Sequence, residues 1–149
     1  MFNRIMVPVD GSQEAARAVA VAVEEAHHQR PPAEVTLVNV ISPIPMAKAI
    51  PGGLDYLRRY LPDLEEDRRN EARGILAEAS RSLREQGISV QTIVLEGHPA
   101  EAILNYAREQ SQDLIVMGSR GLTGTSEILL GSVSNAVVHH AGCAVLIVR

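Results

Sequence analysis

Five short runs rich in valine, isoleucine and leucine recur along the chain, and they constrain its fold more than any other feature. The runs occupy residues 4–9, 34–41, 88–95, 113–117 and 143–148. Several of them are apolar at consecutive positions, which is typical of strands that are covered on both faces. Strands of this kind form parallel sheets with helices on either side. The runs therefore predict a parallel sheet of five strands.

Helical patterns separate these runs. The expected helices cover residues 12–29, 63–86, 99–110 and 132–140. Ser12 can cap the first helix, and Gly87 can end the second one in a left-handed conformation. Strands that alternate with helices require right-handed crossovers, so the fold class is α/β, a three-layer sandwich. We expect a five-stranded parallel sheet and four main helices. If the strand order is 3-2-1-4-5, as we expect for this fold class, the first and fourth strands are neighbours.

The stretch from Ser42 to Pro62 interrupts this alternation. Its helix-breaking residues are Pro43, Pro45, Pro51, Gly52, Gly53 and Pro62. This composition predicts an excursion over the edge of the sheet, with a short helix from Leu54 to Tyr60. With 149 residues, 46% of them hydrophobic, the chain suits one core, and no internal repeat or linker divides it. We therefore expect a single domain over residues 1–149.

Charge and hydropathy exclude several classes of partner. A net charge of -4 lacks the positive excess of a protein that binds nucleic acid without regard to sequence. No apolar run approaches the roughly 20 residues that cross a bilayer, so we expect no contact with a membrane. The single cysteine cannot form an intrachain disulfide, and Met1 leads directly into the first apolar run without a leader. These features favour a cytoplasmic protein.

The ends of the first and fourth runs carry the residues best suited to bind a ligand. In a doubly wound sheet, ligands bind beyond the carboxyl ends of the strands, where the strand order reverses. The first run ends at Asp10, and the fourth ends in Gly118, Ser119, Arg120 and Gly121. In the expected order these two ends are neighbours. Asp10 can accept hydrogen bonds from ribose hydroxyls, or it can serve as a turn or capping residue.

Glycines provide two possible anion sites. Gly118 and Gly121 allow close approach of the backbone and positive φ, so the amides between them can form a concavity for an anion. Further along, Gly131 and Ser132 open the last helix, whose N-terminal amides are a second set of donors. Two anion sites on one ligand suggest a triphosphate. The same residues can instead be structural, with glycine turning the chain and Ser132 capping the helix.

Other nucleotide and catalytic sites fit the sequence less well. The chain's single lysine, Lys48, lies in the proline-rich stretch, so neither a P-loop nor a receiver-type phosphoacceptor site can be completed. Flavin binding is disfavoured because aromatic residues are scarce. We find no Ser-His-Asp arrangement with a supporting motif, and no carboxylate cluster for two metal ions.

The glycine spacing matches a known family motif at every position. Gly118, Gly121, Gly131 and Ser132 follow the pattern glycine, two residues, glycine, nine residues, glycine, serine or threonine. This pattern resembles that of the nucleotide-binding members of the universal stress protein family. The segments that resemble the family in order are "RIMVPVDGSQEAARAV", "VTLVNVI", "EGHPAEAIL", "DLIVMGSRG" and "AVLIVR". One departure is Ala144, where relatives often have proline.

The resemblance implies an adenine nucleotide alpha hydrolase-like fold that binds ATP or a related adenine nucleotide, and we expect Mg²⁺ with it. Asp10 would hold the ribose, Pro8 and Val9 would line the adenine pocket, and the Val40 backbone would contact the adenine edge. The residues that would surround the ribose and phosphates are Met117, Gly118, Gly121, Gly131, Ser132, Val133 and Ser134. Ser119 and Arg120 lie in the variable part of the motif and complete the candidate site. Charge and position suggest Arg120 as a phosphate contact.

Three functions remain open. We favour a nucleotide-dependent regulatory or stress-response protein, in which ATP occupancy biases a conformation or the contact with an unknown protein partner. A slow ATP hydrolase or phosphotransfer protein is the alternative, and a dimeric scaffold with an empty pocket is the third. The last run, Cys143 to Val148, is expected at a sheet edge, where an apolar strand can pair with a strand of another chain. We therefore expect a homodimer through this strand, as the family resemblance also implies.

Overall fold

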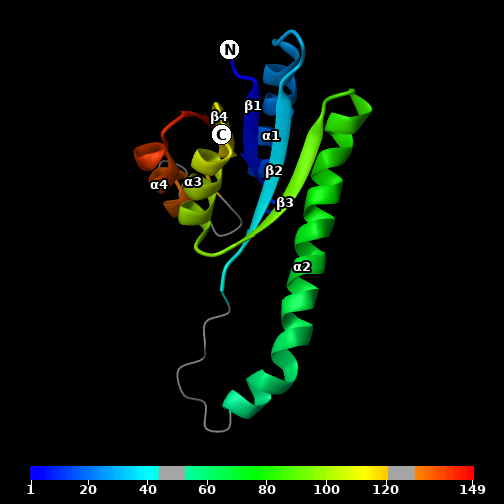
Figure 1. The fold of residues 1–149 in the computed structure, drawn as a ribbon, viewed down its shortest axis with the longest axis vertical. Coiled ribbons are helices and arrows are strands. Elements are labelled where there is room, and N and C mark those ends of the chain that lie inside the picture. Colours follow the sequence, from blue (N-terminus) through cyan, green and yellow to red (C-terminus); the bar gives the residue numbers. More distant parts are fainter. Residues whose placement is uncertain (44–52, 121–129) are drawn as a thin grey trace.

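The computed structural model describes residues 1–43, 53–120 and 130–149, and it contains the expected five-stranded parallel sheet (Figure 1). The strands are β1 (Arg4–Pro8), β2 (Glu34–Ile41), β3 (Val90–Glu96), β4 (Leu114–Gly118) and β5 (Ala144–Val148). Their order is β3-β2-β1-β4-β5, and all neighbouring pairs are parallel. The predicted order is confirmed, with β1 and β4 adjacent at the point where the order reverses.

Two layers of helices cover the sheet. The helices are α1 (Gln13–His27), α2 (Gly53–Glu85), α3 (Pro99–Glu109) and α4 (Ser132–His140). Residues of α1 and α2 share one apolar cluster with the sheet, and residues of α3 and α4 share a second cluster. The three-layer α/β sandwich is therefore confirmed.

The central strands are buried on both faces. Along β1, Ile5 and Val7 pack in the cluster with α1 and α2, whereas Met6 between them packs in the cluster with α3 and α4. All three side chains are fully buried. Side chains alternate across a strand, so two packed faces demand apolar residues at every position. This explains the uninterrupted apolar runs in the sequence.

The second helix is longer than the sequence indicates. We expected a helix from residue 63 and a separate short helix at residues 54–60, but α2 is continuous from Gly53 to Glu85, with Pro62 inside it. The proline removes one backbone N–H, so the carbonyl four residues earlier loses its helical partner. Pro62 is exposed and none of residues 61–71 is buried, so no packed core surrounds the proline. The axis of α2 bends near its N-terminal end (Figure 1).

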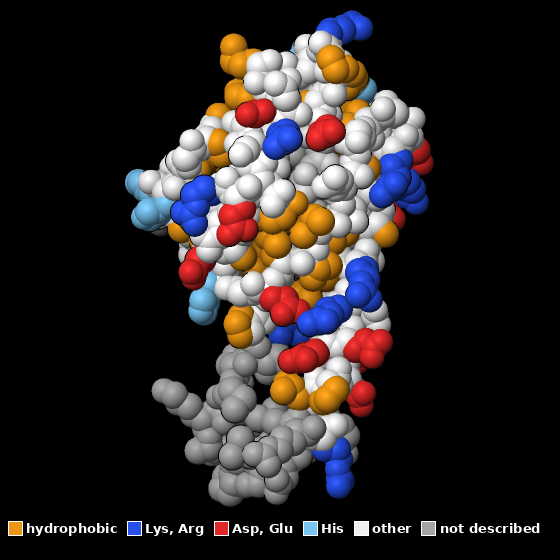
Figure 2. All heavy atoms as spheres, in the orientation of Figure 1, with side chains coloured by type: hydrophobic (Ala, Val, Ile, Leu, Met, Phe, Trp, Pro, Cys, Tyr) orange, Lys and Arg blue, Asp and Glu red, His pale blue; other side chains and the backbone are white. Residues whose placement is uncertain are grey.

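The surface of α2 carries charged side chains of both signs (Figure 2). Among the residues that the structure describes, no helix combines the length and the apolar character needed to cross a membrane. The part of the predicted excursion at residues 44–52 lies outside the described residues.

Small side chains let α1 approach the sheet closely. Ala18, Ala22 and Ala26 are fully buried on its inner face, and Ser12 caps its N-terminus by accepting a hydrogen bond from the Ala15 amide at 3.1 Å. At the end of β4, a Cβ added to Gly118 would lie 2.7 Å from Cβ of Glu14 and 3.1 Å from its carbonyl carbon. Position 118 is therefore restricted to glycine by the first turn of α1.

This close contact predicts the effect of Gly118→Ala. The added methyl group has to displace helix backbone, so we expect the free energy of unfolding to fall by about 1–3 kcal/mol, the usual cost of overpacking. Chemical denaturation of the purified variant measures the change.

Gly74→Ala is the matched control, because nothing lies within 4 Å of a Cβ at this position in α2. Replacing a helical glycine by alanine should stabilise the protein by about 0.5–1 kcal/mol. Equal stability of Gly118→Ala and the wild type would contradict the close packing of α1 on β4.

Candidate functional site

The end of β1 is held from β2. The Val9 amide donates to the Val38 carbonyl at 2.8 Å, and the Asn39 side-chain amide donates to the Val9 carbonyl at 2.8 Å. Asn39 is buried, so this bond satisfies a polar group in the core while it positions the last residues before Asp10. Asn39 is not among the residues predicted from the sequence. Its signal is a lone amide side chain within the apolar run at residues 34–41.

The residues after β1 form a tight turn into α1. The Ser12 amide donates to Oδ1 of Asp10 at 2.9 Å, and Gly11 between them has φ +84°. This is the local turn that aspartate side chains form with the backbone two residues on. The turn role considered for Asp10 is therefore present, and it fixes the carboxyl group at the carboxyl end of β1. The part-exposed Pro8 ends the strand, and Val9 is buried.

One carbonyl joins the end of β4 to the start of α4. The Ser119 carbonyl accepts hydrogen bonds from the Gly131 amide and from Oγ of Ser134, each at 2.7 Å. Ser134 is almost fully buried, and its Oγ also lies 3.0 Å from the Gly131 carbonyl. The ends of the chain segment that connects β4 to α4 are thus held together. The predicted residue Ser134 contacts the backbone of this junction.

The start of α4 approaches the junction closely. A Cβ at Gly131 would lie 3.3 Å from Cα of Arg120 and 3.4 Å from the Ser119 carbonyl oxygen. Gly131 occupies the N-cap position and has no side chain to cap the helix. The first amides of a helix have no carbonyl partner within that helix, so the α4 N-terminus offers donors for an anion. Ser132 is exposed in this first turn.

The remaining predicted residues come from three adjacent strands and the same helix turn. Val40 and Met117 belong to the apolar cluster on the α3 and α4 face, against which Val133 also packs. Asp10 follows the central strand β1, and Gly118 ends the neighbouring strand β4. The structure therefore brings the predicted residues together at the carboxyl edge of β2, β1 and β4. Gly121 lies outside the described residues, and so does part of the predicted concavity.

Burial changes the pKa of two side chains, Cys143 and Tyr106. Burial raises the pKa of the Cys143 thiol, a backbone hydrogen bond opposes part of the increase, and the Asp113 charge adds to it. Burial also raises the pKa of the Tyr106 hydroxyl. Both groups are therefore neutral at pH 7. Within residues 1–43, 53–120 and 130–149, no three His, Cys, Asp or Glu side chains are grouped to hold a metal ion.

A separate hollow of about 1060 Å³ lies between α2 and β3, and we call it the α2–β3 groove. Its walls are residues 69–85 of α2 and residues 92–96 of β3, and none of the predicted site residues lines it. The α2–β3 groove is thus distinct from the candidate site at the ends of β1 and β4. The glycine and strand patterns gave no signal for it, because its walls come from a charged helix and an edge strand.

Comparison with known proteins agrees with the motif in the sequence. The family model described as the universal stress protein family matches residues 1–149. The chain is 37% identical to universal stress protein YxiE of Bacillus subtilis over 150 aligned residues, covering all of both chains. The structure of MJ0577 from Methanocaldococcus jannaschii is similar with a TM-score of 0.82 and 28% identity, over 99% of this chain and 96% of that one.

A further similar structure is a universal stress protein in complex with cAMP, with a TM-score of 0.69 and 25% identity, over 99% of this chain and 97% of that one. The family model matches the whole chain, and the similar structures share its fold over nearly its whole length. The chain therefore belongs to the universal stress protein family.

Proposed function

We propose that this chain is a single-domain, cytoplasmic regulatory protein that binds ATP or another adenine nucleotide at the carboxyl edge of β2, β1 and β4. One observation carries the proposal. The Ser119 carbonyl holds the end of β4 against the N-terminus of α4, beside the turn that positions Asp10. A helix N-terminus and an acidic side chain at a strand switch point are the groups that bind the phosphates and the ribose of a nucleotide.

The base and the sugar would occupy the end nearer β2. The part-exposed Val40 would offer apolar surface and backbone groups that can bond the adenine edge, and the buried Val9 would lie beneath the base. Asp10 would accept hydrogen bonds from the ribose hydroxyls, and the Asp10–Ser12 turn holds its carboxyl group in place for this role. Carboxylates bind ribose hydroxyls in this way in other nucleotide-binding folds of the same topology.

The phosphates would lie near the end of β4 and the first turn of α4. The amides of Ser132 and Val133 and the dipole of α4 favour an anion at this position. The guanidinium of Arg120, next to Ser119, adds a positive charge to the phosphate end. Mg²⁺ bound with the nucleotide would be held mostly by phosphate oxygens and water, as is usual for this ion. Ser134 would act as a positioning residue through its bond to Ser119.

A relative supports the class of ligand. The universal stress protein in complex with cAMP shares 25% of its residues with this chain over nearly its whole length. The ligand of that protein contains adenine, ribose and a phosphate, and these are the three groups for which the candidate site has matching chemistry.

The role of Asp10 can be tested by Asp10→Asn. Asparagine forms the same local turn as aspartate but binds hydroxyl groups less strongly. We expect ATP to bind about tenfold more weakly, since a hydrogen bond to a charged group contributes about 1.5 kcal/mol or more. Isothermal titration calorimetry with ATP and Mg²⁺ measures the change.

A dideoxy-ATP that lacks both ribose hydroxyls provides the control on the ligand side. It should bind wild type and Asp10→Asn with equal affinity, because it cannot make the bond that the substitution weakens. An equal loss of affinity for ATP and for dideoxy-ATP would show that Asp10 does not bind the ribose. Absence of ATP binding to the wild type would overturn the proposed function itself.

A regulatory role predicts that the bound nucleotide persists. When the purified protein is incubated with radiolabelled ATP and Mg²⁺, we expect the label to remain as ATP through many cycles of dissociation and rebinding. Thin-layer chromatography of the released nucleotide measures this. Sustained formation of ADP that the Asp10→Asn variant lacks would support the slow ATP hydrolase instead.

We further propose a homodimer through antiparallel pairing of β5. This strand is at one edge of the sheet, and Leu146 on it is 37% exposed, so an apolar strand faces solvent. Pairing with a second copy would bury both edges. Leu146→Lys should therefore convert the dimer to a monomer in sedimentation velocity, because the paired strands would bring two buried ammonium groups together.

Leu64→Lys is the control for this prediction. Leu64 has a similar exposure, 43%, but lies on the solvent-exposed N-terminal part of α2. The control should remain dimeric. A Leu146→Lys variant that sediments as a dimer would refute pairing through β5.

A further inference from the structure

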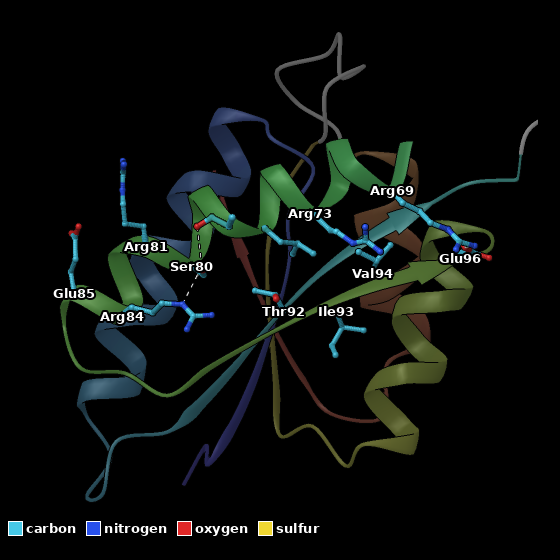
Figure 3. A pocket seen from close by; sticks show the side chains of 12 residues that line it. Arg69, Arg73, Ser80, Arg81, Arg84, Glu85, Thr92, Ile93, Val94 and Glu96 are labelled. Atoms are coloured by element: carbon cyan, nitrogen blue, oxygen red, sulfur yellow. Dashed lines mark hydrogen bonds and ion pairs between the residues drawn. The ribbon is translucent and has the colours of Figure 1, made fainter. Parts of the chain in front are cut away.

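The α2–β3 groove lies between one face of α2 and the edge strand β3 (Figure 3). On α2, one face presents Arg69, Arg73, Ala77, Ser80 and Arg84, at spacings of three or four residues that place them in one row. Arginines lie toward the ends of this row, and small side chains lie between them. Ala77 and Ser80 project little from the helix, so the α2 wall of the groove is lowest at the middle of this row.

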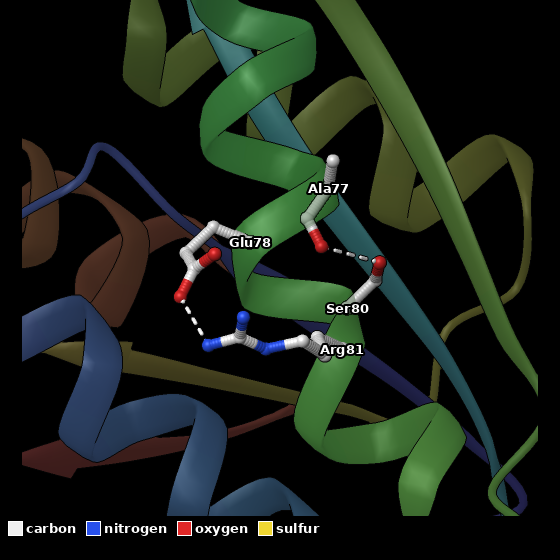
Figure 4. A network of polar contacts seen from close by, with 4 residues as sticks. All are labelled: Ala77, Glu78, Ser80 and Arg81. Carbon is white, nitrogen blue, oxygen red and sulfur yellow. Dashed lines mark hydrogen bonds and ion pairs between the residues drawn. The ribbon is translucent and has the colours of Figure 1, made fainter.

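The small residues of the row are satisfied within the helix. Ser80 is buried, and its hydroxyl donates to the Ala77 carbonyl at 2.9 Å (Figure 4). The neighbouring Arg81 pairs with Glu78 at 2.8 Å on the same turns of α2 (Figure 4). The middle of the row, at Ala77 and Ser80, is therefore uncharged.

Two arginines in the α2–β3 groove differ from the others in their partners. Arg69 forms a salt bridge with Glu96. Arg73 instead bonds Asn70 Oδ1 at 3.3 Å, and Arg84 bonds Ser80 Oγ at 3.4 Å. Among the described residues, neither Arg73 nor Arg84 has a carboxylate within salt-bridge distance. The groove therefore has two positive charges whose partners are neutral, about 16 Å apart along the helix axis.

The opposite wall of the groove is an open strand edge. Within the described residues β3 pairs with β2 alone. The Ser89 carbonyl accepts from Val35, and the Gly97 amide donates to Ile41, so the odd-numbered residues of this segment direct their backbone groups toward β2. Even-numbered residues alternate with them, so the N–H and C=O groups of Thr92 and Val94, which line the groove, project away from β2 at the open edge of β3.

From this geometry we propose that the α2–β3 groove binds an extended acidic segment of a partner protein, which adds a sixth strand beside β3. The backbone of the segment bonds the outward groups of Thr92 and Val94, and its acidic side chains bond Arg73 and Arg84. Side chains alternate across a strand, so two carboxylates on the face toward α2 are an even number of residues apart. A separation of four or six residues places them about 13 or 20 Å apart, close to the spacing of the two arginines. The long arginine side chains span the difference.

A polypeptide fits this groove better than a nucleic acid does. The edge of β3 presents alternating donors and acceptors, which match the backbone of another strand. A nucleic acid has no such repeat of backbone donors and acceptors, so it cannot add to the edge of β3 as a strand. The charge of the partner segment follows from Arg73 and Arg84, because opposite charges across an interface favour association. This site is separate from the proposed nucleotide site and can be tested without nucleotide.

A synthetic peptide tests the proposal on the whole 149-residue chain. The probe is a fluorescent, end-blocked nonapeptide in which glutamate alternates with valine, and fluorescence anisotropy measures its dissociation constant. We expect saturable binding that weakens as salt is added, because the ion pairs are exposed. The same peptide with glutamine in place of glutamate should bind at least about fivefold more weakly.

Paired substitutions test the arginines. The double variant Arg73→Gln and Arg84→Gln should bind the glutamate peptide about fivefold to tenfold more weakly, and should no longer distinguish it from the glutamine peptide. The control is Arg17→Gln with Arg108→Gln, which removes the same charge from α1 and α3. Arg108 donates to the Asn105 side chain as Arg73 donates to the Asn70 side chain, so replacing Arg108 removes the same kind of local contact as replacing Arg73. The control should bind the peptide as the wild type does.

Thr92→Pro tests the strand edge. Proline removes the outward N–H of this residue without disturbing a bond to β2, so the fold should persist, as thermal unfolding can verify, while peptide binding is lost. A glutamate peptide N-methylated at alternate residues tests the same bonds on the wild type and should not bind.

Three results would overturn the proposal. The first is that the glutamate peptide fails to bind at millimolar concentration. The second is equal binding to the arginine double variant and its matched control, or equal binding of the N-methylated and unmodified peptides. The third is that a single-stranded oligonucleotide binds more tightly than the peptide and depends on Arg73 and Arg84, which would assign the groove to nucleic acid.

Discussion

The burial of β1 and β4 on both faces is the constraint on which the rest of the structure depends. Ile5, Met6 and Val7 are fully buried, and consecutive residues of a strand face opposite sides. Each face therefore needs its own layer of helices, and each parallel strand needs a helix to return the chain. Among the residues that the structure describes, the outer strands β3 and β5 pair with a strand on one side only, so each has an edge that faces away from the sheet.

The candidate nucleotide site follows from the same constraint. Strand order reverses between β1 and β4, so the segments that follow these strands diverge and leave their carboxyl ends accessible. Two contacts then define the geometry at this position. Gly118 allows the first turn of α1 to pack against the end of β4, and the Ser119 carbonyl joins that end to α4. The proposed phosphate donors are thus fixed by packing before any ligand binds.

Particular residues show how far the sequence analysis reached. The apolar runs predicted all five strands, and Ser12 predicted the start of α1, because burial on two faces and helix capping leave local signals. The start of α2 was predicted wrongly, because exposure to water reduces the cost of Pro62 in a helix, and exposure depends on the arrangement of the other elements. Asn39 was missed because its partner, the Val9 carbonyl, belongs to another strand. Gly118 was predicted for its backbone freedom, whereas the structure shows contact with Glu14 as a reason for glycine.

The sequence by itself determined the fold class, the family and the set of candidate nucleotide residues. These properties depend on periodicity and on a motif of fixed spacing, both of which are local in the chain. The tertiary structure alone decided which carbonyl joins β4 to α4, which helix turn excludes a side chain at position 118, and which arginines face the open edge of β3. Each of these is a contact between residues distant in sequence, and a contact of this kind exists only once the layers have packed.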